Sequence, residues 1–256
     1  MAHHGLTEQI LPGYDFVNNT ELVYDSSKKD EYYHGTHVAG IIAQNAPKAQ
    51  ILPLKVFNNG SANSSDIVQA IEYAETQGAL IVNMSFDSTS IRNDSQPNLV
   101  IKEAIEDSNM LFVCAAGNAR LCIDDYQVYP ICYDLDNIIS VTSINEDSGL
   151  SYFSNYSSNY VDIAAVGKNI NSTWPENEYH SLSGTSQAAA QVSAGAAIAA
   201  SLGSSNIKDT ILSHADRISS LQGLVDGARR FNLENIKNNI VNEEIQYVQY
   251  YDDFNS

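Results

Sequence analysis

Short apolar runs alternate with stretches patterned as helices, and this alternation is the feature that most constrains the fold. Residues 80–84 and 110–115 are apolar runs of strand length. Before and between them, apolar residues recur at the three- and four-residue spacing of one helical face: Ile67, Ala70, Ile71 and Ala74, then Val100, Ile101, Ala104 and Ile105. A strand, helix, strand, helix, strand order at this spacing indicates a parallel sheet covered by helices.

The same pattern extends along most of the chain. We expect a strand over 50–57 followed by a turn at 58–60, further strands at 137–142 and 161–166, and an Ala-rich helix over 186–202. The first helix has N-cap candidates at 64–66 and ends at Gly78, and Pro97 opens the second. The predicted fold class is α/β, a single domain with a mostly parallel sheet and helices on both faces.

No linker-like segment and no internal repeat divides the chain. We assign residues 1–241 to this domain. Residues 242–256 hold acidic and Tyr residues but no Lys or Arg, so we expect an acidic, Tyr-rich tail on the surface.

The net charge of the chain limits the classes of molecule that it is expected to bind. The sequence holds 13 Lys and Arg against 31 Asp and Glu, a net charge of −18. A field of that sign repels phosphate backbones and anionic lipids, which argues against nucleic-acid and membrane partners. No apolar run approaches the roughly 18 residues needed to cross a bilayer, and the chain start lacks the pattern of a signal peptide.

Two smaller features leave alternatives open. His3 and His4 fit either a fragment of an expression tag or an ordinary chain start. Cys122 and Cys132 could form a disulfide that closes one loop, or both could be free thiols, whereas Cys114 lies in an apolar run.

Three clusters of small and polar residues stand where helices begin or strands end, and active sites of α/β sheets lie at such ends. Residues 34–40 begin a helix with His34 in its first turn, 115–118 follow a predicted strand, and 183–190 place Ser186 at the mouth of the Ala-rich helix. Each cluster alone has an ordinary alternative. His34 and His37 could be a structural or metal-binding pair, residues 115–118 a turn, and Ser186 an N-cap.

Together, in the order His, Asn, Ser, these clusters resemble motifs of the subtilisin-like serine proteases, the subtilase (peptidase S8) family. Residues 34–40 are similar to its histidine motif, 83–86 to its substrate-binding strand, 116–118 to its oxyanion motif and 184–186 to the start of its serine motif. The similar spacing extends from about residue 13 to about residue 211. An α/β-hydrolase acting on esters is less favoured, because Ser186 is not in a Gly-x-Ser-x-Gly motif.

The resemblance implies a serine endopeptidase acting on extended peptides. Ser186 would be the nucleophile, His34 its general base, and Asn118 would share the oxyanion hole with the Ser186 N–H. His37 would be structural. The implied substrate-binding residues are Ser85, Phe86, Gly60, Ser61, Ala116 and Gly117. The chemistry needs no cofactor, while the family resemblance implies a structural Ca²⁺ and secretion.

The sequence departs from the family pattern beside these motifs. Asp87 and Ser88 stand where two glycines are common, and Gln187, Ala190 and Gln191 replace the usual Met, Pro and His. Together with the acidic composition of the chain, Asp87 predicts a preference for peptides that are basic or neutral near the cleavage point.

The largest departure concerns the third catalytic residue. The family's catalytic Asp sits in an Asp-Ser/Thr-Gly turn, which occurs nowhere in this sequence. Residues 13–18 resemble the segment after that turn, so the counterpart would fall about two or three residues before Met1. Asp15 belongs to that later segment, and Asp30 matches a non-catalytic acid.

The strand that carries this Asp would lie inside the sheet, so its loss would expose a sheet edge. Two hypotheses follow: a peptidase whose sequence starts after its third catalytic residue, or a pseudo-protease that binds extended peptides without cutting them.

Overall fold

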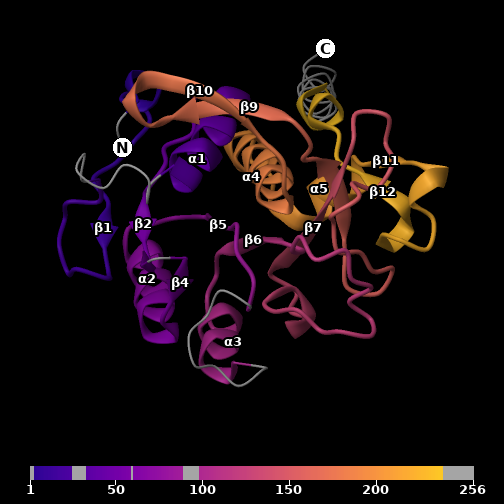
Figure 1. Ribbon diagram of the computed structural model, residues 1–256, viewed down its shortest axis with the longest axis horizontal. Helices are drawn as coiled ribbons and strands as arrows, with labels where there is room; N and C mark the ends of the chain where they lie inside the picture. Colours follow the sequence, from indigo (N-terminus) through magenta and orange to yellow (C-terminus); the bar gives the residue numbers. More distant parts are fainter. Residues whose placement is uncertain (1–2, 25–32, 59, 89–97, 239–256) are drawn as a thin grey trace, which may run out of the picture.

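A six-stranded sheet forms the centre of the fold (Figure 1). The computed structural model describes residues 3–24, 33–58, 60–88 and 98–238. In spatial order the strands are β11 (Asp216–Arg217), β12 (Arg229–Arg230), β8 (Ile163–Val166), β7 (Ile138–Ile144), β6 (Leu111–Ala115) and β5 (Ile81–Met84). All neighbours pair in parallel except β11 and β12.

Helices cover both faces of this sheet, as the alternating pattern predicts. Side chains of β6 alternate between the two faces because a strand has a period of two. Phe112 and Cys114 pack with α2 (Ser64–Thr76) and α3 (Leu99–Glu106). Leu111, Val113 and Ala115 pack with α4 (Thr185–Ser201) and α5 (Ile207–Ser213). The predicted α/β class is therefore confirmed.

Smaller elements surround the main sheet. β1 (Tyr14–Asp15) pairs in parallel with β2 (Leu54–Lys55), and two antiparallel pairs join β3 (Phe57–Asn58) to β4 (Ser61–Ala62) and β9 (Ile170–Trp174) to β10 (Glu178–Leu182). Helix α1 (Tyr33–Asn45) lies beside α4. Short 3₁₀ helices are His4–Leu6, Ile131–Tyr133, Pro175–Asn177, Ser219–Leu221 and Asp226–Ala228.

Several predicted details differ in the structure. The strand expected over 50–57 is divided into β2 and β3, with only a bridge from Ile51 to Ile10 before them. Asn63, not one of residues 64–66, is the N-cap of α2. Val100 is 59% exposed although Ile101 and Ile105 are buried, so the buried stripe of α3 is narrower than predicted. Pro97 and the tail over 242–256 lie outside the described residues.

The open alternative at the cysteines has a structural answer, and His3 is packed in the fold. Cys114, Cys122 and Cys132 are free, and the Val128 N–H donates to Cys132 Sγ at 3.4 Å. Burial raises the pKa of Cys132 to about 11. His3 is 5% exposed and packs edge-on against Tyr179 with ring centroids 4.9 Å apart, so this histidine is part of the domain.

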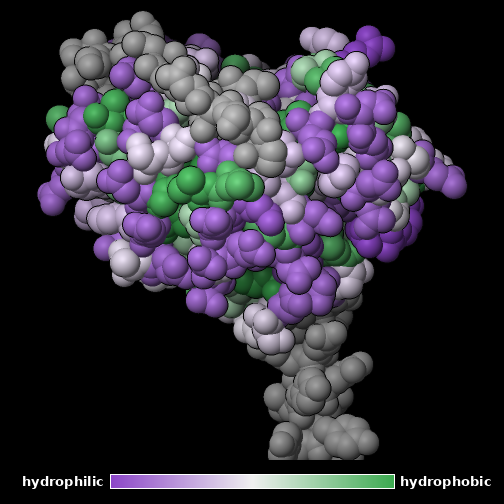
Figure 2. Space-filling model, turned by 90° about the horizontal axis from the view of Figure 1, so that it is seen from below, coloured by the Kyte–Doolittle hydropathy of each residue, from purple (hydrophilic) through white to green (hydrophobic). Residues whose placement is uncertain are grey.

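The surface shown in Figure 2 is mainly hydrophilic, with apolar side chains gathered in small patches between polar ones. This fits the net charge of −18. Within the described ranges, none of the helices combines the length and the apolar character needed to cross a membrane.

Helix α1 packs so closely on β9 that only glycine fits at position 40. The hydroxyls of Ser172 and Thr173 donate to the carbonyls of His37 and Thr36, at 2.7 and 2.8 Å. A Cβ added to Gly40 would lie 2.1 Å from Thr173 Oγ1 and 2.4 Å from Ser172 Oγ. This approach fixes α1, and with it His34, against the β9–β10 hairpin.

We predict that Gly40→Ala lowers the free energy of unfolding by about 1–3 kcal/mol, because the new methyl group overpacks the contact with β9. Urea denaturation measures the change. Gly35→Ala is the matched control, since a Cβ there meets nothing within 4 Å. Equal stability of the two variants would contradict the packing argument.

Candidate active site

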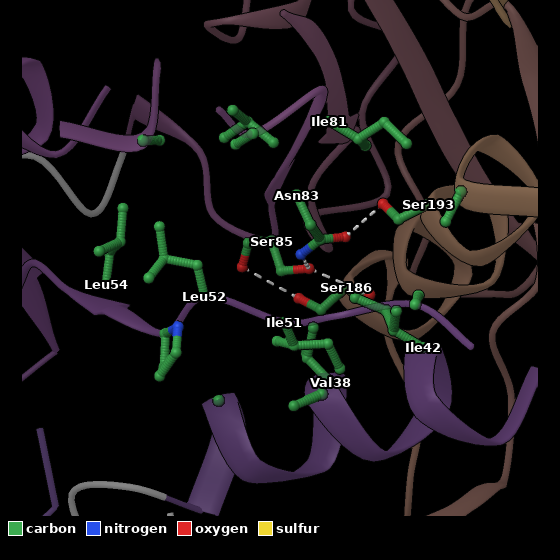
Figure 3. A pocket seen from close by; sticks show the side chains of 18 of the residues that line it. Val38, Ile42, Ile51, Leu52, Leu54, Ile81, Asn83, Ser85, Ser186 and Ser193 are labelled. Atoms are coloured by element: carbon green, nitrogen blue, oxygen red, sulfur yellow. Dashed lines mark hydrogen bonds between the residues drawn. The ribbon is translucent and has the colours of Figure 1, made fainter. Parts of the chain in front are cut away.

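A cavity of about 1270 Å³ lies between β2 and β5, beside α1 and the start of α4 (Figure 3). His34, Asn118 and Ser186 come from three separate parts of the chain, and all three line it. The predicted substrate-binding residues Ser85, Phe86, Gly60 and Gly117 line it as well. Ser61 and Ala116 lie outside its lining: Ser61 pairs with Asn58 in a hairpin, and Ala116 is fully buried.

Ser186 lies in the first turn of α4 and is 8% exposed. Its Oγ donates to the Ser85 carbonyl at 3.2 Å, and Ser85 Oγ donates to the Ser186 carbonyl at 3.1 Å (Figure 3). Asn83 extends this pair, because its Nδ2 donates to Ser85 Oγ at 2.8 Å and its Oδ1 accepts from Ser193 Oγ at 2.9 Å. These bonds tie the carboxyl end of β5 to α4.

Thr185 fixes the orientation of the Asn118 amide. Asn118 Oδ1 accepts from the Thr185 N–H at 2.9 Å and from Thr185 Oγ1 at 3.2 Å. Because the amide oxygen is engaged, the NH₂ group is the end left to donate to a ligand. Thr185 Oγ1 also accepts from the Gly117 N–H at 3.1 Å. Sequence reasoning gave Thr185 no role, although it directly precedes Ser186.

Asn155 holds the turn that presents Asn118. It is 1% exposed, its Nδ2 donates to the Ala116 carbonyl at 2.8 Å, and its Oδ1 accepts from the N–H groups of Ala119 and Leu121. A side chain on Gly117, where φ is +96°, would collide with Asn155 Nδ2 at 2.5 Å. No sequence signal identified Asn155, because its partners lie more than 30 positions away.

His34 stands in the first turn of α1 and is half-buried. Burial lowers the pKa of His34, and the nearby His37 adds a smaller effect of the same sign. Within the described part of the chain, no hydrogen bond joins the His34 ring to Ser186 or to a carboxylate. Ser186 Oγ instead donates to the carbonyl of Ser85.

His37 uses both of its ring nitrogens inside the fold. Nε2 lies 3.1 Å from the Ile170 carbonyl and 3.0 Å from the His180 carbonyl, and Nδ1 lies 3.5 Å from Gln187 Nε2. Carbonyls only accept, so Nε2 carries the hydrogen and Nδ1 is the acceptor. His37 therefore has no nitrogen left for a metal, which removes the alternative of a His34–His37 ligand pair.

Asp15 and Asp87 occupy different environments. Asp15 is 1% exposed, pairs with Lys55 at 3.3 Å and accepts from the N–H groups of Val17 and Asn18, so it stabilises a turn and does not itself line the cavity. Asp87 lines the cavity, and its Oδ2 would lie 2.8 Å from a Cβ added to Gly117. Asp30 lies outside the described residues.

The chain matches the model of the Subtilase family over residues 3–243. It belongs to that family. It is 36% identical over 233 residues to thermitase from Thermoactinomyces vulgaris, covering 85% of this chain and 77% of that protein. It is also 36% identical to the major intracellular serine protease of Bacillus subtilis (strain 168), covering 77% of this chain and 64% of that relative.

A solved chain of the subtilase cytotoxin SubAB shares the fold, with a TM-score of 0.81, 24% identity, and coverage of 96% of this chain and 88% of that one. At this low identity, the match shows the fold alone.

One of the relatives is named as intracellular, so membership of this family does not fix a localisation. Across the described ranges no group of three or more His, Cys, Asp or Glu side chains is arranged to hold a metal ion, and structural Ca²⁺ stays a prediction from the family.

We predict that stability falls as pH decreases below about 6.5. Burial lowers the folded-state pKa of His37, so the unfolded chain binds a proton first. The stabilisation by neutral His37 is complete above the unfolded pKa and decreases toward the folded one, with a slope of at most about 1.4 kcal/mol per pH unit for one proton.

Urea denaturation between pH 5 and 7.5 measures this slope in the wild type and in His37→Gln. The Gln amide can still donate to the two carbonyls but does not titrate, so the variant should have the shallower slope. Identical pH dependence in both proteins would contradict the assignment of a titrating, buried His37.

Proposed function

We propose that this subtilase is a serine endopeptidase that hydrolyses peptide bonds through an acyl-enzyme on Ser186. The observation that carries the proposal is that His34, Asn118 and Ser186 line one cavity although 84 and 68 positions separate successive members. Membership of a family whose relatives are serine proteases supports the same reaction class.

Stabilisation of the oxyanion comes from two donors. The Ser186 N–H lies in the first turn of α4, where backbone N–H groups have no partner within the helix and the dipole favours negative charge. The Asn118 NH₂ is the second donor, because Thr185 holds the amide oxygen. Removal of the corresponding amide in subtilisin, another member of this family, lowers kcat by roughly 10²–10³.

His34 acts as the general base, and burial keeps it neutral at lower pH than a free imidazole. To react, Ser186 Oγ leaves the Ser85 carbonyl, gives its proton to His34 and attacks the scissile carbonyl. His34 then returns the proton to the leaving amine. Loss of the third catalytic residue alone costs roughly 3 × 10⁴ in kcat in subtilisin, so without a carboxylate at His34 the reaction is slow.

An extended peptide is the substrate form that suits the cavity walls. Ser85 and Phe86 continue from β5 on one side, and Gly60 stands at the β3–β4 hairpin on the other, where the neighbouring Ser61 lies outside the lining. The Phe86 ring packs on Phe57 with centroids 5.2 Å apart, which gives the wall an apolar part. From the family we also propose that the protein is secreted and that it holds a structural Ca²⁺.

Asp87 sets the preference at the reacting bond. Its carboxylate lies against Gly117, the residue before Asn118, and so beside the position of the scissile carbonyl. The Ser88 N–H donates to the Tyr129 carbonyl at 2.8 Å, which holds this segment in place. A negative charge at this wall attracts a cationic side chain near the cleavage point and repels an acidic one.

We predict that a fluorophosphonate probe labels wild-type protein slowly at Ser186 and does not label Ser186→Ala. Mass spectrometry of the labelled peptide identifies the site. Ser213→Ala, which removes the last serine of α5 outside the cavity lining, is the control and should label like the wild type. Equal labelling of Ser186→Ala and wild type would contradict the peptidase proposal. Binding of peptides without any labelling would favour the pseudo-protease.

We predict that Asp87→Asn reduces the preference for basic over neutral side chains by about fivefold, since a partly exposed ion pair is worth up to about 1 kcal/mol. The measurement compares labelling rates of peptidyl phosphonates carrying Lys or norleucine at the reacting position. Asp107→Asn changes the same charge at the end of α3 and should leave the ratio unchanged. A faster reaction of an acidic probe would contradict the role of Asp87.

A further inference from the structure

Three aromatic rings stack where the β9–β10 hairpin meets the start of α1. The centroid of the Trp174 ring lies 4.8 Å from that of Tyr33 and 4.4 Å from that of His180, with the ring planes tilted by 31° and 36°. Tyr33 is the first residue of α1 and directly precedes His34. Tyr33 and His180 are exposed, so the stack is accessible from solvent beside the general base.

A carboxylate stands at the same stack. Glu178 is exposed, and its Oε2 lies 2.9 Å from Nε2 of His180. The other carboxylate oxygen, Oε1, has no hydrogen-bond partner among the residues that the structure describes. Residues 169–207 include Glu176 and Glu178 but no Lys or Arg. The rings therefore lie in a part of the chain whose fixed charges are all negative.

The face of the hairpin that carries the stack leads toward the nucleophile. Side chains alternate across a strand, so Glu178, His180 and Leu182 share one face of β10. Trp174 is paired with Glu178 and lies on the same face. β10 ends at Leu182, and Ser186 follows four positions later in the first turn of α4.

Contacts on other sides hold the hairpin in place. The His180 carbonyl accepts from Nε2 of His37, so α1 fixes the backbone of β10 at the stack. Tyr179 points to the opposite face, where its ring packs on His3, and Asn177 Oδ1 accepts from the His4 N–H at 2.8 Å. A ligand at the stack therefore binds to rings that are already positioned, which lowers the entropy cost of binding.

Aromatic faces beside a carboxylate are suited to a cation. A guanidinium group suits them best, because it is planar, stacks on an aromatic ring and donates to a carboxylate through its fork of N–H groups. An ammonium group makes only a point contact. A neutral ring could stack on Tyr33 but would gain nothing from the charge of Glu178.

We propose that Tyr33, Trp174, His180 and Glu178 form a binding site for an arginine side chain of the peptide substrate. The placement of this arginine within the substrate rests on the proposed function. The walls proposed for the extended peptide are the end of β5 and the β3–β4 hairpin. In the view of Figure 1, α1 lies between the β9–β10 hairpin and β4, so the stack is on the other side of His34.

The arginine therefore belongs to the part of the peptide that leaves with the amine after acylation. The chain from His180 to Ser186 spans at most about 20 Å, at roughly 3.3 Å per residue. An extended substrate covers the same distance in about six residues, so the arginine is expected within about six positions after the scissile bond.

Fluorescence of Trp174 tests the site directly, because this is the only Trp in the sequence. The full chain with Ser186→Ala is titrated with the peptide amide acetyl-Ala-Arg-Ala-Ala, with the same peptide carrying Lys, and with the same peptide carrying citrulline. Citrulline keeps the planar shape of arginine but has no charge. We expect a saturable change in emission with the Arg peptide, and a Kd about fivefold higher with citrulline, since an exposed ion pair is worth up to about 1 kcal/mol. The Lys peptide should lie between them.

Two variants, each combined with Ser186→Ala, separate the carboxylate from general charge. Glu178→Gln keeps a group that can bond to His180 and should bind the Arg peptide no better than citrulline. Glu103→Gln makes the same change of charge on α3 and should bind like the parent protein. Equal Kd values for Arg and citrulline, an absence of any saturable change, or equal losses in both variants would overturn the site.

Digestion of a mixed peptide library by wild-type protein tests the place of the arginine, with mass spectrometry of the products. We expect Arg to be enriched at one of the first six positions after the cleaved bond, less so with Glu178→Gln, and unchanged with Glu103→Gln. No enrichment there would overturn the placement. Absence of cleavage with binding intact would contradict the peptidase proposal and the placement, whereas cleavage without binding of the Arg peptide would contradict the arginine site alone.

Discussion

Close packing of α4 against the sheet and α1 is the constraint on which the site depends. The helix contacts β5, β6, β7, β8 and α1, and Ala188, Ala189 and Ala190 are fully buried in its first turns. Small side chains let the helix approach its neighbours closely, and the loop before it is held as tightly. The Gly184 N–H donates to the Gly167 carbonyl at 2.8 Å, and a Cβ on Gly167 would lie 2.5 Å from the Gly184 carbonyl oxygen. The position of Ser186 follows from these contacts.

The departures from the family pattern near Ser186 have partners that suit this packing. Gln187 approaches His37, Gln191 donates to the Val166 carbonyl at 2.7 Å, and Ala190 packs with Val38 and Ile41. The side chains of Gln187 and Gln191 both have polar partners. Burying these amides therefore costs little free energy at positions where the family commonly has other residues. Because His37 bonds in turn to the Ile170 and His180 carbonyls, the Gln187 contact joins α4 and α1 to the β9–β10 hairpin.

The sequence predicts those parts of the fold that local patterns determine. The helical stripe from Ile67 to Ala74 and the apolar run of β6 are each encoded within a short window, and both lie where predicted. The pairing of β1 with β2 joins residues 40 positions apart, and the roles of Thr185 and Asn155 depend on contacts across more than 30 positions. Such long-range contacts leave no periodic signal in a single sequence. The motifs of the site were recognisable, but the direction of the Asn118 amide was not, because Thr185 determines it.

Strand β5 connects stability to catalysis. Among the described residues β5 is the last strand of the main sheet, and Ile81 on it is only half-buried. Since the hydrogen bonds from Asn83 to Ser85 and from Ser85 to Ser186 begin at that same strand, ordering of the strand also orders the nucleophile. The bonds that hold β5 against α4 therefore also hold the nucleophile, so changes that loosen this end of the sheet are expected to lower folding free energy and reaction rate together.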